Sequence, residues 1–199
     1  MTTATDLDNL TIEVAELWPR RGQWTETDYF NLPPSNRLVE LSEGELFVMP
    51  PPGFTHQKTL DNLYSALKAF VEERGAGVTV FAPLAVRLWP GKIREPDILF
   101  YTQAHRDRIG EQVSGPPDLA VEIISPGSRA TDRLDKFYEY ARAGIAEYWL
   151  VDPQAKTVEV FTLEEGAYEL LAKAEATGAA VSRLLPGLEI PCRLIFTAL

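Results

Sequence analysis

The sequence is poor in cysteine, histidine and long apolar runs, and each shortage excludes a class of protein. Its single cysteine, Cys192, excludes an intramolecular disulfide framework and a zinc site made of cysteines alone. The two histidines, His56 and His105, are too few for a histidine-rich zinc centre. No apolar run approaches the roughly 20 residues of a membrane-spanning helix. The segment 1–10 lacks the basic and apolar parts of a secretory signal, so we expect a cytoplasmic protein without membrane contact.

Basic residues are also scarce. The chain has 19 Lys and Arg residues against 29 Asp and Glu residues, which gives a net charge of −10. Non-specific binding to nucleic acid depends on neutralising phosphates with Lys and Arg. A nucleic-acid substrate would therefore need a local basic face, a bound cation or a second subunit.

Several common catalytic and phosphate-binding motifs are missing. The chain contains neither the Gly-x-x-x-x-Gly-Lys phosphate loop nor the Gly-x-Gly-x-x-Gly dinucleotide motif. No Gly-x-Ser-x-Gly elbow surrounds Ser125 or Ser128, so turn and cap roles are expected for these serines. Nucleotide binding of these two kinds and serine-nucleophile catalysis are not expected.

The remaining composition is that of a globular protein of 199 residues, with 45% hydrophobic and 24% charged residues. We expect an N-terminal arm over residues 1–23 and a single nuclease-like domain over residues 24–199. Apolar periodicity predicts helices at 24–30, 55–74 and 131–143. Strands are expected at 37–41, 45–49, 78–81, 84–88, 98–101, 119–124, 147–151, 157–161 and 168–171. This order predicts an α/β or α+β fold with a mixed β-sheet flanked by helices.

Two acidic residues stand where a buried sheet would otherwise be apolar. Glu122 interrupts the apolar run 119–124, and Asp97 precedes the strand expected at 98–101. Ionised carboxylates are rarely buried unless they are paired or bound to a cation. On neighbouring strands both carboxylates would reach one hard cation, and Mg²⁺ prefers such oxygen ligands together with water. We therefore predict a Mg²⁺ site at Asp97 and Glu122, in which Mn²⁺ substitutes.

Lys136 adds a positive charge to this set. It lies in the helix that follows the Glu122 strand, and a helix returning over the sheet would direct its ammonium group toward the same carboxylates. There it could polarise a phosphate. Two alternatives stay open: Glu122 as a buried carboxylate paired with an arginine or lysine, and Lys136 as a surface residue paired with Asp132 or Asp135.

With further motifs, these residues resemble the Uma-type family of putative restriction endonucleases, within the PD-(D/E)XK nuclease superfamily. The resemblance runs from about residue 24 to the C-terminus. Its motifs are Val39-Glu40-Leu41, Gly44-Glu45-Leu46, Met49, His56, Pro96-Asp97, the run 121–126, Asp132, Lys136, Tyr140, Gly144, the run 147–153 and the run 185–188.

The resemblance implies a restriction-endonuclease-like core and a set of roles. Asp97, Glu122 and the backbone carbonyl of Ile123 would hold the metal, and Glu40 would be an added acidic member of the site. His56 would bind substrate or Glu40; the alternative is a helix-start histidine that faces solvent. The superfamily signature places a lysine two residues after the second acid, where this chain has Ile124. The Uma-type pattern relocates that charge to the next helix, which here means Lys136.

The function expected from these features is that of a metal-dependent phosphodiesterase, specifically a Mg²⁺-dependent DNA endonuclease that uses an activated water. Its catalytic set would be Asp97, Glu122, Lys136 and Glu40. Two alternatives stay open: a nuclease-fold binding module with little or no activity, and a hydrolase of a small phosphorylated substrate. We also expect a homodimer, because two-fold-related sites match the symmetry of a duplex.

Overall fold

A six-stranded mixed sheet forms the centre of the computed structural model, which describes residues 18–33, 37–125 and 127–197. Residues 1–17 of the expected arm, and Pro126 of the 121–126 motif, lie outside the described residues. The sheet order is β10-β9-β8-β7-β6-β3; β7 and β8 run parallel and the other neighbours antiparallel. Its strands are β3 Gly77–Phe81, β6 Ile98–Thr102, β7 Leu119–Ile123, β8 Glu147–Asp152, β9 Thr157–Glu164 and β10 Ala167–Ala174.

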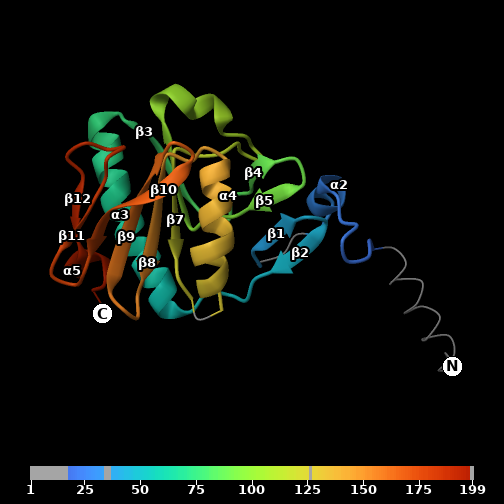
Figure 1. Cartoon of the computed structure of the whole chain (residues 1–199), viewed down its shortest axis with the longest axis horizontal. Coiled ribbons are helices and arrows are strands. Elements are labelled where there is room, and N and C mark those ends of the chain that lie inside the picture. Colours follow the sequence, from blue (N-terminus) through green and yellow to red (C-terminus); the bar gives the residue numbers. More distant parts are fainter. Residues whose placement is uncertain (1–17, 34–36, 126, 198–199) are drawn as a thin grey trace, which may run out of the picture.

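Helices cover both faces of this sheet, with α4 in front of it and α3 behind it in Figure 1. The helices are α2 Glu26–Phe30, α3 Phe54–Arg74, α4 Lys136–Arg142 and α5 Cys192–Ile195, with a 3₁₀ helix at Gln103–Arg108 and a π-helical turn at Thr131–Asp135. The predicted fold class, a mixed sheet flanked by helices, is therefore confirmed.

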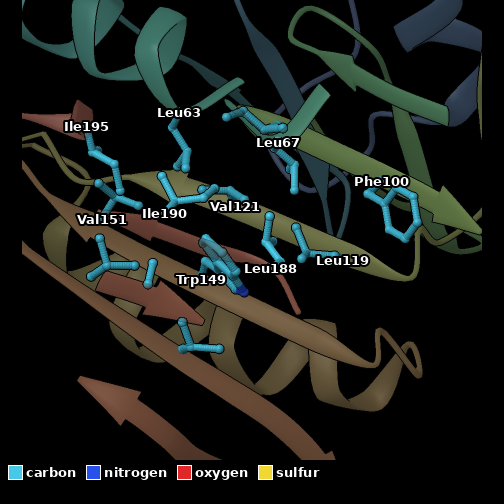
Figure 2. Close-up of a cluster of buried hydrophobic side chains, with 14 of the residues drawn as sticks. Leu63, Leu67, Phe100, Leu119, Val121, Trp149, Val151, Leu188, Ile190 and Ile195 are labelled. Atoms are coloured by element: carbon cyan, nitrogen blue, oxygen red, sulfur yellow. The ribbon is translucent and has the colours of Figure 1, made fainter. Parts of the chain in front are cut away.

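The α3 face of the sheet holds one of two large apolar clusters. Leu60, Leu63, Leu67 and Val71 recur every three or four residues along α3 and are all buried. Figure 2 shows Leu63 and Leu67 reaching toward Val121 and Trp149 of the sheet, with side chains from the C-terminal segment completing the cluster. The helix ends at Gly75, whose φ of 58° is the left-handed conformation that glycine adopts readily.

The opposite face packs against α4 through a cluster rich in aromatic residues. Tyr140 of α4 meets Tyr148 of β8 edge to face, with ring centroids 5.1 Å apart. Phe137 adds a further edge contact with Phe161. Both tyrosines are fully buried, so their hydroxyl groups need partners inside the protein. The Tyr140 hydroxyl donates to Glu122 of β7, and the Tyr148 hydroxyl donates to the carbonyl of Asp132.

A second sheet of four strands, in the order β2-β1-β5-β4, lies beside the first (Figure 1). Its strands are β1 Val39–Ser42, β2 Glu45–Val48, β4 Val86–Trp89 and β5 Lys92–Arg94; β11 Ala179–Val181 and β12 Glu189–Pro191 form a separate pair. The predicted hairpin at 37–49 is confirmed, with its turn at Glu43 and Gly44. The sequence did not predict β5, which joins this hairpin to β4.

Local sequence signals explain where the small elements begin. Thr25 caps α2 through a reciprocal capping box with Asp28, as the spacing of the two residues predicts. Within the described ranges, no helix is both long enough and apolar enough to cross a membrane.

Candidate active site

Asp97 and Glu122 meet at one end of the central sheet because β6 and β7 are antiparallel neighbours. Ile98 pairs with Val121, and one further step of this register places Asp97 opposite Glu122. The backbone N–H of Ile123 donates to Oδ2 of Asp97 at 2.7 Å, which fixes that carboxylate. Both acids are almost fully buried. The predicted convergence of the two carboxylates is therefore observed.

Glu122 is held by a lysine and a tyrosine at the same oxygen. The Tyr140 hydroxyl donates to Oε1 at 2.6 Å, and Nζ of Lys136 lies 2.9 Å from it. Burial raises the pKa of Glu122 well above its usual value; Lys136 opposes this shift, and the nearby carboxylates, Asp132 first, reinforce it. Glu122 is thus a buried carboxylate paired with a lysine, which was the alternative that the sequence left open. It also lies beside Asp97, as the predicted metal site requires.

Lys136 is buried, with 3% of its surface exposed, and it lies among three carboxylates. Nζ is 2.9 Å from Glu122, 3.2 Å from Glu40 and 3.5 Å from Asp132. Burial alone would lower its pKa, but these acids outweigh burial and raise the pKa well above the usual value. The alternative of an exposed surface lysine is therefore wrong, although the Asp132 contact that it named is present.

Glu40 reaches the site from β1, which belongs to the four-stranded sheet and not to the central one. Its second oxygen is 2.7 Å from Nη1 of Arg94. Burial raises the pKa of Glu40, but Lys136 and Arg94 together outweigh it and the net shift is downward. Glu40 has two cations where Glu122 has one, which explains why the two buried glutamates shift in opposite directions.

His56, in the first turn of α3, contacts Asp97 and not Glu40. Its Nε2 lies 3.2 Å from Oδ2 of Asp97, and 15% of its side chain is exposed, so the solvent-facing alternative is wrong. Burial lowers the pKa of His56, while Asp97, Asp132 and the backbone of Ile123 raise it, and the net shift is upward. Its Nδ1 is buried and makes no hydrogen bond of ordinary geometry.

Sequence reasoning assigned no role at the site to Arg94, Glu95 or Asp132. Arg94 lies on the unpredicted strand β5 and links Glu40 to Glu139 of α4. Glu95 accepts a hydrogen bond from the N–H of Val39 at 3.1 Å, and burial raises its pKa to about 7. Two signals placed Asp132 near the site: its spacing of four residues from Lys136 and its place among the motifs of the family resemblance.

Lys136, His56 and the nearby acids, but not Arg94, line a cavity of about 330 Å³. The acidic wall is formed by Glu40, Glu95, Asp97, Glu122 and Asp132. The apolar segment 49–53, which connects β2 to α3, also lines the cavity. The lining thus combines buried acids with an apolar loop.

The donor set of this cavity fits a divalent cation. Five carboxylates line it against two basic side chains, Lys136 and His56, and the pKa of Glu122, Glu95 and Asp132 is raised in each case mainly by burial. Oδ1 of Asp132 is buried without a hydrogen bond. The contacts above engage Oδ2 of Asp97 and Oε1 of Glu122, which leaves one oxygen of each for another ligand. The surplus of buried acid is the feature that a bound cation would relieve.

In the described part of the chain, no group of three or more His, Cys, Asp or Glu side chains is arranged to hold a metal ion. Mg²⁺ does not require such a cage, because it is commonly held by one or two carboxylates and several waters. Ile123 also lines the cavity. The role of its carbonyl as a ligand, like Mg²⁺ itself, stays a prediction.

The fold and the acidic cavity define a nuclease-like protein, and comparison with known proteins gives the family. The model of the family Uma2, described as a putative restriction endonuclease, matches residues 26–193. The chain belongs to this family, and the predicted resemblance is confirmed.

A crystal structure of a putative nuclease belonging to DUF820, from Anabaena variabilis ATCC 29413, is similar with a TM-score of 0.71. The two share 20% sequence identity over 86% of this chain and 97% of the other, so this likeness supports the fold. No curated protein matches the chain.

Proposed function

We propose that this protein is a divalent-metal-dependent phosphodiesterase that hydrolyses DNA. The observation that carries the proposal is the convergence of Asp97 and Glu122 at the end of β6 and β7, with Lys136 2.9 Å from Glu122. Membership of a family described as putative restriction endonucleases supports a nuclease activity. Mg²⁺ is the cation that fits a site of two carboxylates.

Asp97, Glu122 and the Ile123 carbonyl would hold the ion. A Mg²⁺ ion bound there supplies Lewis acidity, which lowers the pKa of a water and offsets negative charge on a phosphate. The hydrogen bond from the N–H of Ile123 holds the Asp97 carboxylate at this place. The site is therefore organised before substrate arrives, which is the arrangement that favours electrostatic catalysis.

Lys136 and His56 act on the phosphate itself. As the water oxygen bonds to phosphorus and the bond to the leaving sugar oxygen breaks, negative charge grows on the non-bridging oxygens. The buried ammonium of Lys136 attracts this charge and, with a raised pKa, stays protonated throughout the neutral range. His56 lines the same cavity and can donate a hydrogen bond to the phosphate or to the leaving oxygen.

The test compares Asp97→Asn and Glu122→Gln with the wild type on plasmid and on single-stranded DNA, with Mg²⁺ or Mn²⁺. Each variant keeps the size of its side chain and loses the charge. We expect hydrolysis to fall by at least about 100-fold, the typical effect of removing one group that stabilises a transition state. Asp61→Asn, at an exposed position of α3, is the control and should keep full activity. Undiminished cleavage by either site variant would refute the assignment.

A nuclease-fold binding module with little activity is the second candidate. It is favoured by the ion pairs of Lys136 with Glu122 and Glu40, which already neutralise part of the acidic cluster, and by Ile124 at the signature lysine position. Calorimetry separates the two functions. A vestigial site should take up no Mg²⁺ or Mn²⁺ in a way that depends on Asp97. The predicted homodimer belongs to the first candidate, in which two sites would cut two strands.

A further inference from the structure

A second cavity of about 330 Å³ adjoins the catalytic one. The two share Leu38, Pro52, His56 and Asp97, so they meet at the carboxylate that the proposed reaction needs. The second cavity has its own lining of different chemistry: Arg37, Gln57, Leu60, Phe81, Ala82 and Pro83. No part of the proposed hydrolysis uses these residues.

The topology of the sheet places this second cavity one strand further along from the acids. Glu122, Asp97 and Phe81 come from the neighbouring strands β7, β6 and β3, or directly adjoin them. Phe81 pairs with Ile98, and the next N–H, that of Ala82, donates to the carbonyl of Asp97 at 3.0 Å. Backbone hydrogen bonds between β3 and β6 thus hold Phe81 at the same end of the sheet as the catalytic carboxylates.

Phe81 is both exposed and held in place. Half of its surface, 49%, is open to solvent, although it is a large apolar side chain beside a cavity. Its ring packs edge to face on Tyr64 of α3, with centroids 4.7 Å apart and an interplanar angle of 71°. The Tyr64 hydroxyl is itself bonded to the carbonyl of Thr79 at 3.4 Å. An edge contact of this kind fixes a ring while leaving a face for stacking.

The side chains that line this second cavity indicate which kind of ligand it can bind. An exposed aromatic ring stacks on a nucleobase, an amide such as that of Gln57 can hydrogen-bond the edge of a base, and the guanidinium of Arg37 suits a phosphate. Leu38, Leu60 and Pro83 supply apolar walls for the rest of the base. A base that is paired and stacked within a duplex cannot offer its face to a side chain.

We propose that this second cavity binds an unstacked nucleobase next to the scissile phosphate, so that the substrate is single-stranded DNA. This inference rests on the proposed hydrolysis for its context but uses different residues. The charge of the chain agrees with it. At −10, and with Lys136, His56 and Arg37 as the basic residues of the two cavities, the protein offers little to neutralise duplex phosphates. Stacking supplies affinity that does not depend on those charges.

The test measures binding of a fluorescein-labelled oligothymidylate by anisotropy, with phosphorothioate linkages to prevent hydrolysis. We expect Phe81→Ala to weaken binding about tenfold, within the range reported for losing one base–aromatic stack. Phe81→Tyr keeps a stacking ring and should bind like the wild type. Tyr138→Ala removes another exposed aromatic, 69% exposed on α4 and outside both cavities, and should have no effect.

Three results would overturn the inference: unchanged binding by Phe81→Ala, equal or tighter binding of the annealed duplex, and no binding of the oligonucleotide to the wild type. Hydrolysis assays on the same proteins separate this inference from the proposed function. Phe81-dependent binding without hydrolysis of any substrate supports the subsite while the hydrolysis proposal fails. Cleavage of duplex DNA that is equal in wild type and Phe81→Ala supports hydrolysis and overturns the subsite.

Discussion

At the residue scale, the site is a set of carboxylates arranged around one buried ammonium group. Lys136 lies within 3.5 Å of Glu40, Glu122 and Asp132, and Arg94 gives Glu40 a second partner. Removing one member of a buried ion pair usually destabilises a protein strongly, because the other charge stays buried without a partner. We therefore expect each charge of the cluster to affect stability.

Lys136→Met keeps the length of the side chain and removes its charge. We expect the variant to lose about 3–5 kcal/mol of unfolding free energy at neutral pH, because three carboxylates lose their shared cation. Urea unfolding followed by circular dichroism measures this change. Lys58→Met, at a partly exposed residue of α3 whose ion pair with Asp61 lies at the surface, is the control and should change stability by less than about 1 kcal/mol. Wild-type stability for Lys136→Met would show that the ammonium does not balance the cluster.

Glu122→Gln should have the opposite effect on the metal-free protein. The pKa of Glu122 is raised above the usual 4.5, mainly by burial, so the ionised form lowers stability as the pH rises above that value. The amide keeps a partner for Tyr140 and has no charge. We expect a higher melting temperature than wild type at pH 8 and no gain near pH 4; each 1 kcal/mol corresponds to about 2–4 °C for a chain of this size. Calorimetry with and without Mg²⁺ checks this, since the ion should stabilise the wild type alone. A lower melting temperature at pH 8 would contradict the account.

The site residues that could be predicted from the sequence are charged residues whose neighbours in the sequence are apolar or whose place in an element was clear. Glu122 was visible because it interrupts an apolar strand, and Lys136 because it lies in the helix that follows. Arg94 and Glu95 were missed, because a charged residue in a short polar segment has no such contrast with its neighbours. Their importance comes from long-range contacts with Glu40 and Val39, which no local pattern shows.

At the element scale, β5 is the part of the site that sequence analysis could not find. It has three residues, Lys92–Arg94, with alternation too short to distinguish from a loop. It pairs with β1 and β4, and two of its side chains reach Glu139 of α4: Lys92 at 2.7 Å and Arg94 at 2.7 Å. This strand therefore joins the four-stranded sheet to the helix that carries Lys136.

Arg94→Met should weaken this junction in a pH-dependent way. For both Glu40 and Glu139 burial raises the pKa, but their cations outweigh it and the pKa lies below the usual 4.5. Both acids therefore contribute stability above that pH, and the contribution is lost as the pH falls through their lowered pKa values. We expect a loss of about 3 kcal/mol at pH 7.5 and a smaller loss near pH 4, measured by urea unfolding. A loss that is equal at the two pH values would indicate that Arg94 acts through packing alone.

The helix that carries Lys136 begins with a π-helical turn, Thr131–Asp135, where the sequence predicted a regular α-helix. A π turn holds more residues than the about 3.6 of an α-helical turn. Asp132 lies within this turn and Lys136 directly follows it. Apolar periodicity alone does not reveal the wider turn.

At the scale of the whole molecule, the strands of the central sheet and the helices that flank it followed from periodicity, whereas the pairing of β1, β2, β4 and β5 into a separate sheet did not. Each strand of the second sheet is short, and its order, β2-β1-β5-β4, joins segments far apart in the chain. The predicted hairpin lies in this second sheet, so Glu40 reaches the site from outside the central sheet. The acidic cavity is therefore a junction between two sheets and the start of two helices, which explains why its full lining required the structure.

The net charge of −10 is consistent with this arrangement if a cation is part of the working site. The acids concentrated at the junction would repel a phosphate without such an ion. Activity should therefore depend on divalent metal even where binding to single-stranded DNA relies on stacking.

The most direct measurement is anomalous difference density from a crystal of the protein soaked in Mn²⁺. The account predicts a peak between Asp97 and Glu122, in contact with one oxygen of each, and no such peak in a soaked crystal of Asp97→Asn. A wild-type crystal at saturating Mn²⁺ with no peak there, and Lys136 still bound to Glu122, would contradict it.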